Sequence, residues 1–283
     1  MGRKTTDKVI FENVKVLDAG AKGVSVAKAP DGKVIFIPNV VPGDVVDVQT
    51  FKKRKAYYEG KAINFHEFSE DRIEPICQHF GACGGCKWQN MTYEKQLFYK
   101  NNEVFNHLKR IGKIELPEFE PILGSEKQLF YRNKMEFTFS NRRWLTDAEM
   151  AMGEDKFSPV LGFHPPGAFD KVIDIQHCSL QQEPANHIRN TIRTIAYSQD
   201  LSFYDPRNHE GFLRTLLLRV TKLGEIMVVI AFGEDDAKKI SLFLDEVKTA
   251  LPEITSLFFC VNTKMNDSLY DLEMHHLAGK TSI

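Results

Sequence analysis

The 283-residue sequence predicts a small five-stranded β-barrel followed by an α+β domain with an antiparallel sheet. Three observations lead to this prediction: closely spaced alternating segments in the first 65 residues, two helical patterns later in the chain, and strand-like segments joined by turns. The hydrophobic content of 42% and the charged content of 27% are ordinary for a globular protein of this length. Such a chain can hold two domains with a sizeable core.

The barrel is predicted from five short alternating segments bounded by turn signals. Pro30-Asp31-Gly32 and Pro42-Gly43-Asp44 are the clearest of these turns. The predicted strands cover 10–17, 23–27, 34–37, 45–48 and 57–65. Five strands in so small a module indicate an OB-like barrel, a shape that often binds oligonucleotides, and we assign this domain to residues 1–68.

The charge of the chain is unevenly distributed. Residues 1–61 carry 12 Lys and Arg against 7 Asp and Glu, whereas the remainder carries 25 against 31. Within the basic part, Lys52, Lys53 and Arg54 precede Tyr57, and this mixture of cations and aromatic rings is typical of phosphate contacts and base stacking. These four residues are therefore candidate ligands of a nucleic acid, RNA or DNA, with a solvated hairpin tip as the alternative.

Four cysteines form the most specific pattern in the sequence. Cys77, Cys83 and Cys86 follow the spacing Cys-x5-Cys-x2-Cys in a glycine-rich loop, assigned to 69–91, and Cys178 lies far downstream. Four thiolates suit an iron–sulfur cluster or zinc, while small buried hydrophobes or a disulfide pair are the alternatives. The fifth, Cys260, lies in an apolar segment and is predicted to be buried in a strand.

A helix with a broad apolar face is predicted to follow the cysteine loop. It covers 92–112, with Thr92 as its N-cap and Gly112 at its end. Its apolar face includes Leu97, Val104 and Leu108, so we expect it to dock on a further domain, or to make the isolated chain self-associate.

The remaining residues, 113–283, have an α+β pattern. Strands are predicted near 130–140, 159–163, 172–175, 213–222, 225–232 and 254–262, and helices over 181–197 and 236–250. In the first of these strands Arg132 and Lys134 alternate with Met135 and Phe137. The two cations are candidate ligands of a nucleic acid, and salt bridges on a polar sheet face are the alternative.

Several motifs together resemble the iron–sulfur-containing RNA 5-methyluridine methyltransferases. They are Cys77-x5-Cys83-Gly84-Gly85-Cys86-x2-Gln89, the Tyr-Arg-Asn-Lys-Met-Glu-Phe run at 131–137, and Cys178 within Ile-Gln-His-Cys-Ser-Leu at 175–180. The resemblance implies that the barrel is a TRAM domain, that Cys77, Cys83, Cys86 and Cys178 hold a [4Fe–4S] cluster, and that the methyl donor is S-adenosylmethionine. It also implies an RNA partner, ribosomal in preference to transfer RNA.

The sequence departs from this family at its end. Family members continue into a Rossmann-like domain that binds S-adenosylmethionine and carries the catalytic residues, but no Gly-x-Gly-x-x-Gly loop is found here. We therefore expect the Rossmann-like domain to be absent, no catalytic residue in this chain, and an RNA-binding front part that is inactive alone. A zinc-containing nucleic-acid-binding module without activity and a small electron-transfer protein are the competing hypotheses.

Two further expectations concern location and assembly. The sequence has no apolar run of membrane-spanning length, and its polar start lacks a signal-peptide core, so a cytoplasmic protein without a membrane partner is expected. The full-length enzyme is expected to be a monomer.

Overall fold

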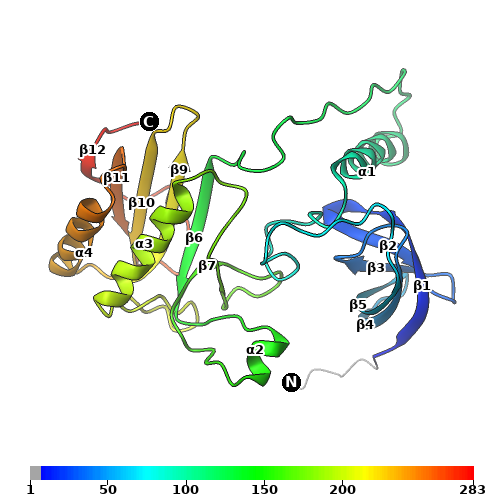
Figure 1. Ribbon diagram of the computed structural model, residues 1–283, viewed down its shortest axis with the longest axis horizontal. Coiled ribbons are helices and arrows are strands. Elements are labelled where there is room, and N and C mark those ends of the chain that lie inside the picture. Colours follow the sequence, from blue (N-terminus) through cyan, green and yellow to red (C-terminus); the bar gives the residue numbers. More distant parts are fainter. Residues whose placement is uncertain (1–7) are drawn as a thin grey trace. The chain divides into compact units, whose positions relative to one another are not determined.

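The computed structural model describes residues 8–283, which form two compact units (Figure 1). The first unit extends to Gly81 and resumes at Cys86–Glu126; the second comprises Ala82–Gly85 and Lys127–Ile283. Each unit has its own sheet.

The first unit is built on a closed five-stranded barrel. Its strands are β1 (Ile10–Ala19), β2 (Val24–Lys28), β3 (Val34–Pro38), β4 (Val45–Lys53) and β5 (Tyr57–Glu67). Their order around the barrel is β1-β2-β3-β5-β4, and only the β3–β5 pair is parallel. All five strands lie where the alternation predicts them.

The barrel interior is filled by the alternate residues of each strand. Val16, Ile35, Ile37, Val46 and Val48 are almost completely buried. Because successive strand residues point to opposite faces, the same alternation exposes the residues between them.

A buried ion pair connects the barrel to the segment that follows it. The Asp44 carboxylate is fully buried and accepts hydrogen bonds from the Arg72 Nη2 at 2.5 Å and Nε at 3.1 Å. It also accepts the backbone N–H groups of Val41 at 2.7 Å and Ser69 at 2.9 Å. Four donors on one carboxylate fix the course of the chain towards the cysteine loop.

The predicted helix after the cysteine loop is present, with a different ending. It is α1 (Tyr93–Asn106), continued by the π-helical turn η2 (His107–Ile111). No residue of either is buried, and the Thr92 side chain makes no capping hydrogen bond. Gly112 keeps a right-handed helical conformation rather than the left-handed one typical of a glycine stop.

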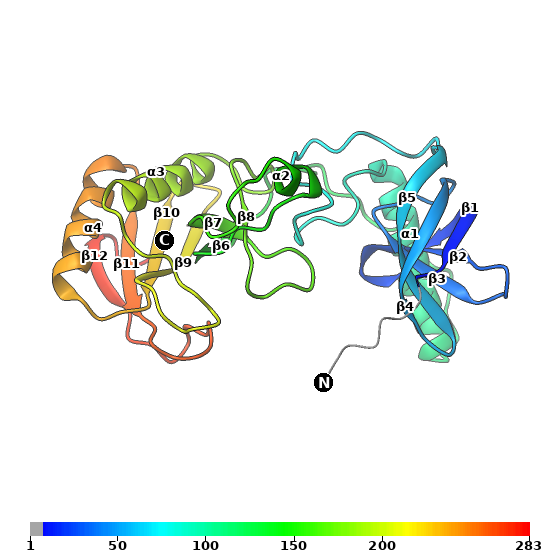
Figure 2. The same cartoon turned by 90° about the horizontal axis from the view of Figure 1, so that it is seen from below.

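The second unit contains a seven-stranded sheet in the order β12-β11-β10-β9-β6-β7-β8. The strands are β6 (Lys134–Ser140), β7 (Val160–Phe163), β8 (Ile173–Asp174), β9 (Leu213–Val220), β10 (Ile226–Phe232), β11 (Ser256–Val261) and β12 (His275–Gly279). The helices are α2 (Asp147–Ala151), α3 (Ala185–Ser198) and α4 (Ala237–Ala250). Figure 2 shows α3 lying along one face of this sheet.

The prediction of an antiparallel sheet is wrong for one pair of strands. β10 and β11 are parallel, whereas every other neighbouring pair in the sheet is antiparallel. The chain passes from β10 through α4 to β11, and a helical crossover is the usual connection between parallel neighbours. The sheet is therefore mixed.

Alternation in β6 directs its side chains to two different faces. Met135, Phe137 and Phe139 are at most 3% exposed, whereas Glu136 is exposed and Lys134 is partly exposed. The predicted division of this strand into an apolar and a polar face is thus confirmed.

Candidate functional site

The cysteine loop is held in shape by its own backbone and by one amide side chain. The Gln89 Oε1 accepts the Cys77 N–H at 3.2 Å, and the Gln89 Nε2 donates to the Cys86 Sγ at 3.2 Å. The backbone N–H of Gly85 donates to the Cys83 Sγ at 3.4 Å. Two of the three sulfur atoms therefore accept N–H hydrogen bonds, as thiolate ligands of a metal cluster commonly do.

Glycines permit two close approaches near this loop. A Cβ added to Gly84 would lie 3.1 Å from the His164 carbonyl oxygen. On the first unit, a Cβ on Gly23 would lie 2.4 Å from the Lys87 Cβ, and the Trp88 Nε1 is 3.5 Å from the same position. The residues that follow Cys86 therefore pack directly on the turn between β1 and β2.

Cys178 lies in a different setting, buried in front of helix α3. Its backbone N–H donates to the Asn186 Oδ1 at 2.8 Å, and its carbonyl oxygen accepts the Asn186 Nδ2 at 3.3 Å. These reciprocal bonds fix the backbone of Cys178 against the first turn of α3. Cys178 and Cys77 are free thiols, and Cys77 is only partly buried.

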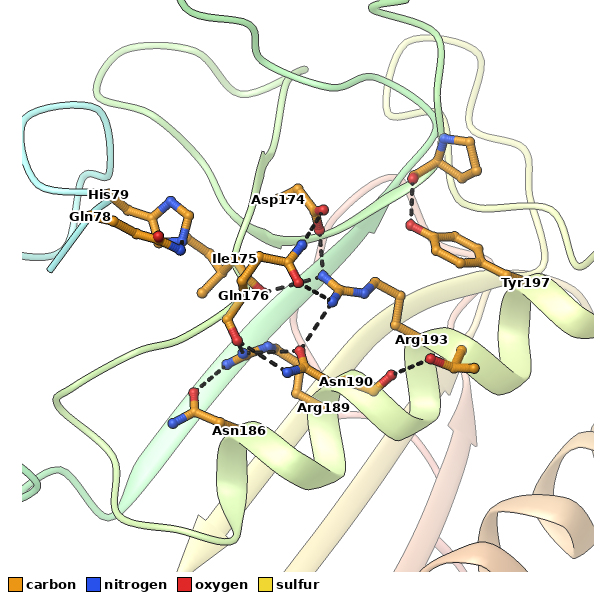
Figure 3. Close-up of polar contacts among 12 residues, drawn as sticks. Gln78, His79, Asp174, Ile175, Gln176, Asn186, Arg189, Asn190, Arg193 and Tyr197 are labelled. Atoms are coloured by element: carbon orange, nitrogen blue, oxygen red, sulfur yellow. Dashed lines mark hydrogen bonds and ion pairs between the residues drawn. The ribbon is translucent and has the colours of Figure 1, made fainter.

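Two arginines of α3, Arg189 and Arg193, form a polar network with the segment 174–176 (Figure 3). Arg193 pairs with Asp174 at 2.6 Å and donates to the Gln176 Oε1 at 2.7 Å. Arg189 is fully buried and donates to the Asn186 Oδ1 at 2.9 Å and to the Gln176 carbonyl at 2.6 Å. Burial lowers the pKa of Arg189 to about 10, Arg193 adds to this effect, and Cys178 opposes it.

The predicted cluster ligands are divided between the two units: Cys77 and Cys86 belong to the first, and Cys83 and Cys178 belong to the second. Among residues 8–283, no three His, Cys, Asp or Glu side chains form a group that could hold a metal ion. N–H groups point at the sulfurs of Cys83 and Cys86. The four-cysteine ligand set remains a prediction.

Cys260 is buried in β11, as the sequence predicts. It is 0% exposed, and burial raises the pKa of its thiol to about 11. A thiol with so high a pKa is a poor nucleophile at neutral pH.

The candidate RNA ligands of the first unit lie at the hairpin between β4 and β5. Lys53 and Arg54 are exposed, whereas Lys52 pairs with Glu59 at 2.6 Å. Tyr57 is partly buried and meets the Phe36 ring edge-on at a centroid distance of 5.4 Å. Lys53 and Arg54 are thus the more available cations of this set.

The candidate RNA ligands of the second unit lie at the start of β6. The Arg132 Nε donates to the Lys134 carbonyl at 3.1 Å, and the Lys134 ammonium pairs with Glu136 at 2.5 Å. Lys134 lies directly opposite Arg219 of β9, an exposed cation that we did not single out as an RNA ligand from the sequence. Like charges placed opposite each other are destabilising, so an anion bound there would relieve the repulsion.

Three residues near the candidate ligands were not predicted from the sequence to have a role there. They are Asn186 and Arg189, near Cys178, and Arg219, opposite Lys134. A helical arginine normally indicates a solvated face, and a cross-strand partner far along the chain has no local signal. Gln89 was noticed only as part of a motif.

Comparisons with known proteins agree with the barrel and relate the chain to RNA methyltransferases. Residues 12–63 match the TRAM domain model. The chain is 49% identical over 265 residues to an "Uncharacterized RNA methyltransferase" of Bacteroides thetaiotaomicron, an alignment covering 92% of this chain and 58% of that protein. A protein of the same description from Porphyromonas gingivalis is 43% identical, with coverages of 95% and 59%.

A solved structure shares the fold. It is the Pyrococcus abyssi tRNA (uracil-54, C5)-methyltransferase in complex with S-adenosyl-L-homocysteine, with a TM-score of 0.62 and 22% sequence identity. The match covers 94% of this chain and 55% of that chain. The chain thus spans somewhat more than half the length of the relatives that it matches.

Two sequence-based predictions are corrected by these matches. We expected the methyltransferase domain to be absent and the chain to be an inactive front part of an enzyme. Proteins described as RNA methyltransferases instead align with 92% and 95% of the chain, and a methyltransferase structure with 94%. Both predictions are therefore contradicted. Separately, no helix among the described residues has the length and apolarity needed to cross a bilayer.

Proposed function

We propose that this protein is an S-adenosylmethionine-dependent RNA methyltransferase that acts on C5 of uracil. The observation that carries this proposal is the similarity of nearly the whole chain to proteins described as RNA methyltransferases, together with a barrel that matches the TRAM domain model. S-adenosylmethionine would supply the methyl group. The RNA is proposed to be ribosomal, with transfer RNA as the second candidate.

RNA binding is proposed to use cations of both units. Lys53 and Arg54 present charge at the β4–β5 hairpin, and Lys134 presents charge at the start of β6. Each cation that contacts a phosphate displaces counterions, so affinity falls as salt rises. Tyr57 supports the hairpin through its contact with Phe36, and its partly exposed ring is available to a base.

A [4Fe–4S] cluster is proposed as a resident cofactor, with Cys77, Cys83, Cys86 and Cys178 as its ligands. The N–H groups directed at the Cys83 and Cys86 sulfurs support this choice. Gln89 links Cys77 to Cys86 and would orient both. The cluster is proposed to brace the cysteine loop rather than to transfer electrons, because methyl transfer needs no net electron transfer.

The activity is tested by incubating the purified protein with labelled S-adenosylmethionine and transcripts of ribosomal and transfer RNA. Nucleoside digestion and mass spectrometry should then detect 5-methyluridine in one class of RNA. Methylation of another base or another position, or no transfer to any RNA, would contradict the proposal.

The RNA surface is tested by salt titration of the binding constant. The double variant Lys53→Gln/Arg54→Gln should weaken binding and make the logarithmic salt slope shallower by about 0.7 for each lost contact to single-stranded RNA. The matched control removes two lysines from helix α4, Lys238→Gln/Lys248→Gln, and should leave the slope unchanged. Equal slopes for both double variants would exclude the hairpin as a phosphate-binding site.

The cofactor is tested by metal and sulfide analysis after anaerobic purification. Iron and acid-labile sulfide near four of each per chain would support the cluster. One zinc without sulfide would instead indicate a structural zinc site.

A further inference from the structure

Phe51 is an exposed aromatic residue on the outside of the barrel, near the end of β4. The residue is 55% exposed, and its ring makes no aromatic or cation–π contact with any residue that the structure describes. The two tyrosines of the β4–β5 hairpin are already engaged. Tyr57 meets the Phe36 ring edge-on at 5.4 Å, and Tyr58 meets the Phe11 ring at 5.1 Å. Phe51 is therefore the ring of this hairpin that is free to contact a ligand.

A β-bulge places Phe51 on the outer surface together with Lys52. Thr50, which is 3% exposed, pairs with Gly60, and the next pair joins Lys52 to Glu59. Phe51 is the extra residue between these two pairs. Strict alternation would turn Lys52 into the barrel, whereas the bulge keeps it outside, where its ammonium lies 2.6 Å from the Glu59 carboxylate. The bulge thus brings a free ring and a charged side chain to the same surface.

Phe51 belongs to an apolar surface that extends over three neighbouring strands. Ile10 of β1 and Ile63 of β5 are 50% and 46% exposed. Gln49 lies between these strands, because it pairs with Ile10 on one side and with Lys61 on the other. Lys61 is itself exposed. The outer face of β1, β4 and β5 therefore combines exposed apolar side chains with a cation.

The charge beside this surface favours an anionic ligand. Lys53 and Arg54 are exposed two and three residues after Phe51, and neither forms an ion pair with any residue from 8 to 283. A strand rises about 3.3 Å per residue, so Lys53 lies about 7 Å along β4 from Phe51. A single-stranded nucleic acid offers what these residues can bind, because its phosphates are anionic and its bases have flat faces.

We propose that Phe51 stacks on a base of single-stranded RNA while Lys53 and Arg54 contact the adjacent phosphates. This inference rests on the proposed RNA partner, and it adds the residue that contacts a base. Every base has a flat face, so stacking on Phe51 tolerates many sequences. Phe51 accordingly contributes affinity for RNA and does not select the uridine that is methylated.

The test is the dissociation constant of the whole chain for a labelled uridine oligomer, measured by fluorescence anisotropy over a range of salt concentrations. An oligomer of about 12 nucleotides suits one OB-type barrel, which covers about 4–16. Phe51→Ala should raise Kd about tenfold, equivalent to about 1.4 kcal/mol, within the range for one stacked base. It should leave the salt slope unchanged because no charge is lost, whereas Lys53→Gln/Arg54→Gln makes the slope shallower. The matched control is Phe98→Ala, since Phe98 is 53% exposed on α1; its Kd should stay unchanged.

Two further substitutions distinguish stacking from a general apolar contact. Phe51→Leu keeps an apolar side chain without a ring and should also weaken binding, whereas Phe51→Trp offers a larger ring and should bind at least as tightly. An oligomer without bases keeps the phosphates, so on this probe Phe51→Ala should have no effect. Unaltered affinity of Phe51→Leu, or an equal loss for Phe51→Ala on the two oligomers, would overturn the stacking role.

The outcomes separate this inference from the proposed function. If the unaltered chain binds no RNA at low salt, the proposed RNA partner fails, and the inference fails with it. If the chain binds RNA but transfers no methyl group, the proposed activity fails while the contact of Phe51 is still decided by its variants. If Phe51→Ala and Phe98→Ala have the same Kd for the uridine oligomer, only the role of Phe51 is refuted.

Discussion

Replacing Asp44 by Asn should destabilise the first unit by about 3 kcal/mol. The carboxylate is completely buried and accepts four N–H groups, two of them from Arg72. An asparagine keeps one oxygen and turns an N–H2 group towards donors, so at least one backbone N–H and part of the guanidinium lose their acceptor. Breaking a buried ion pair from one side costs about 3–5 kcal/mol, and the 19% exposure of the Arg72 side chain favours the lower end.

The free energy of unfolding is measured by urea titration at neutral pH. The chain has two tryptophans, so a Trp144→Phe background leaves Trp88 as the only reporter, within the first unit. With a typical urea dependence of about 1–3 kcal/mol per molar, the midpoint should fall by roughly 1–3 M. Asp18→Asn is the control, because Asp18 is exposed and accepts the N–H of the adjacent Ala19. Equal midpoints for the two variants would refute the stabilising role of the buried carboxylate.

Three other predictions test different parts of the chain. Hydrogen bonds from Lys33 and then Tyr58 lower the pKa of Asp31 to about 2 from its ordinary value of 3.8, so its ionised form stabilises the fold above pH 3.8 and this contribution is lost as the pH falls through about 2. Asp31→Asn should therefore flatten the acid-unfolding curve between these values, and an unchanged curve would contradict the assignment. Cys260 should react with iodoacetamide at pH 8 only after unfolding, because burial raises the pKa of its thiol to about 11. Fast labelling of this residue in the native protein, located by mass spectrometry, would contradict the burial of the thiol. Gly162→Ala should lower the free energy of unfolding of the second unit by about 1–3 kcal/mol, because a Cβ there would lie 1.9 Å from the Ile173 carbonyl oxygen and separate β7 from β8. Calorimetry that finds an unaltered stability would show that the strands can move apart freely.

The sequence predicted the strands of the barrel because each buries alternate residues in one small core. It also predicted α3 and α4, whose buried residues recur at helical spacing. The strand β12 was missed because its short segment has few apolar residues and becomes a strand only through pairing with β11. The helix α2 was missed although Thr146 and Glu149 form a capping box, a signal that the sequence does contain.

The parallel pairing of β10 with β11 could also have been predicted from the sequence. A strand, a helix and a second strand in immediate succession are typical of a parallel pair, and the turns elsewhere in this unit led to the wrong generalisation. The cysteine loop was found because its spacing is local. The buried neighbours of Cys178 could not be predicted in this way. Asn186 and Arg189 are residue types that usually lie on the solvated face of a helix, and only the packing of α3 shows that they are buried.

The pairing of β6 with β9 has a consequence for how the protein is made. Every strand of the barrel has been synthesised once Glu67 has been added, so the barrel can close after these residues leave the ribosome, while synthesis of the second unit continues. β6 is synthesised long before Leu216 and Thr215, with which it aligns, so one edge of β6 lacks its neighbouring strand until β9 has been translated. During that interval the nascent second unit exposes the apolar surface and the unpaired edge of an incomplete sheet. A chaperone would have most effect on the yield at this stage.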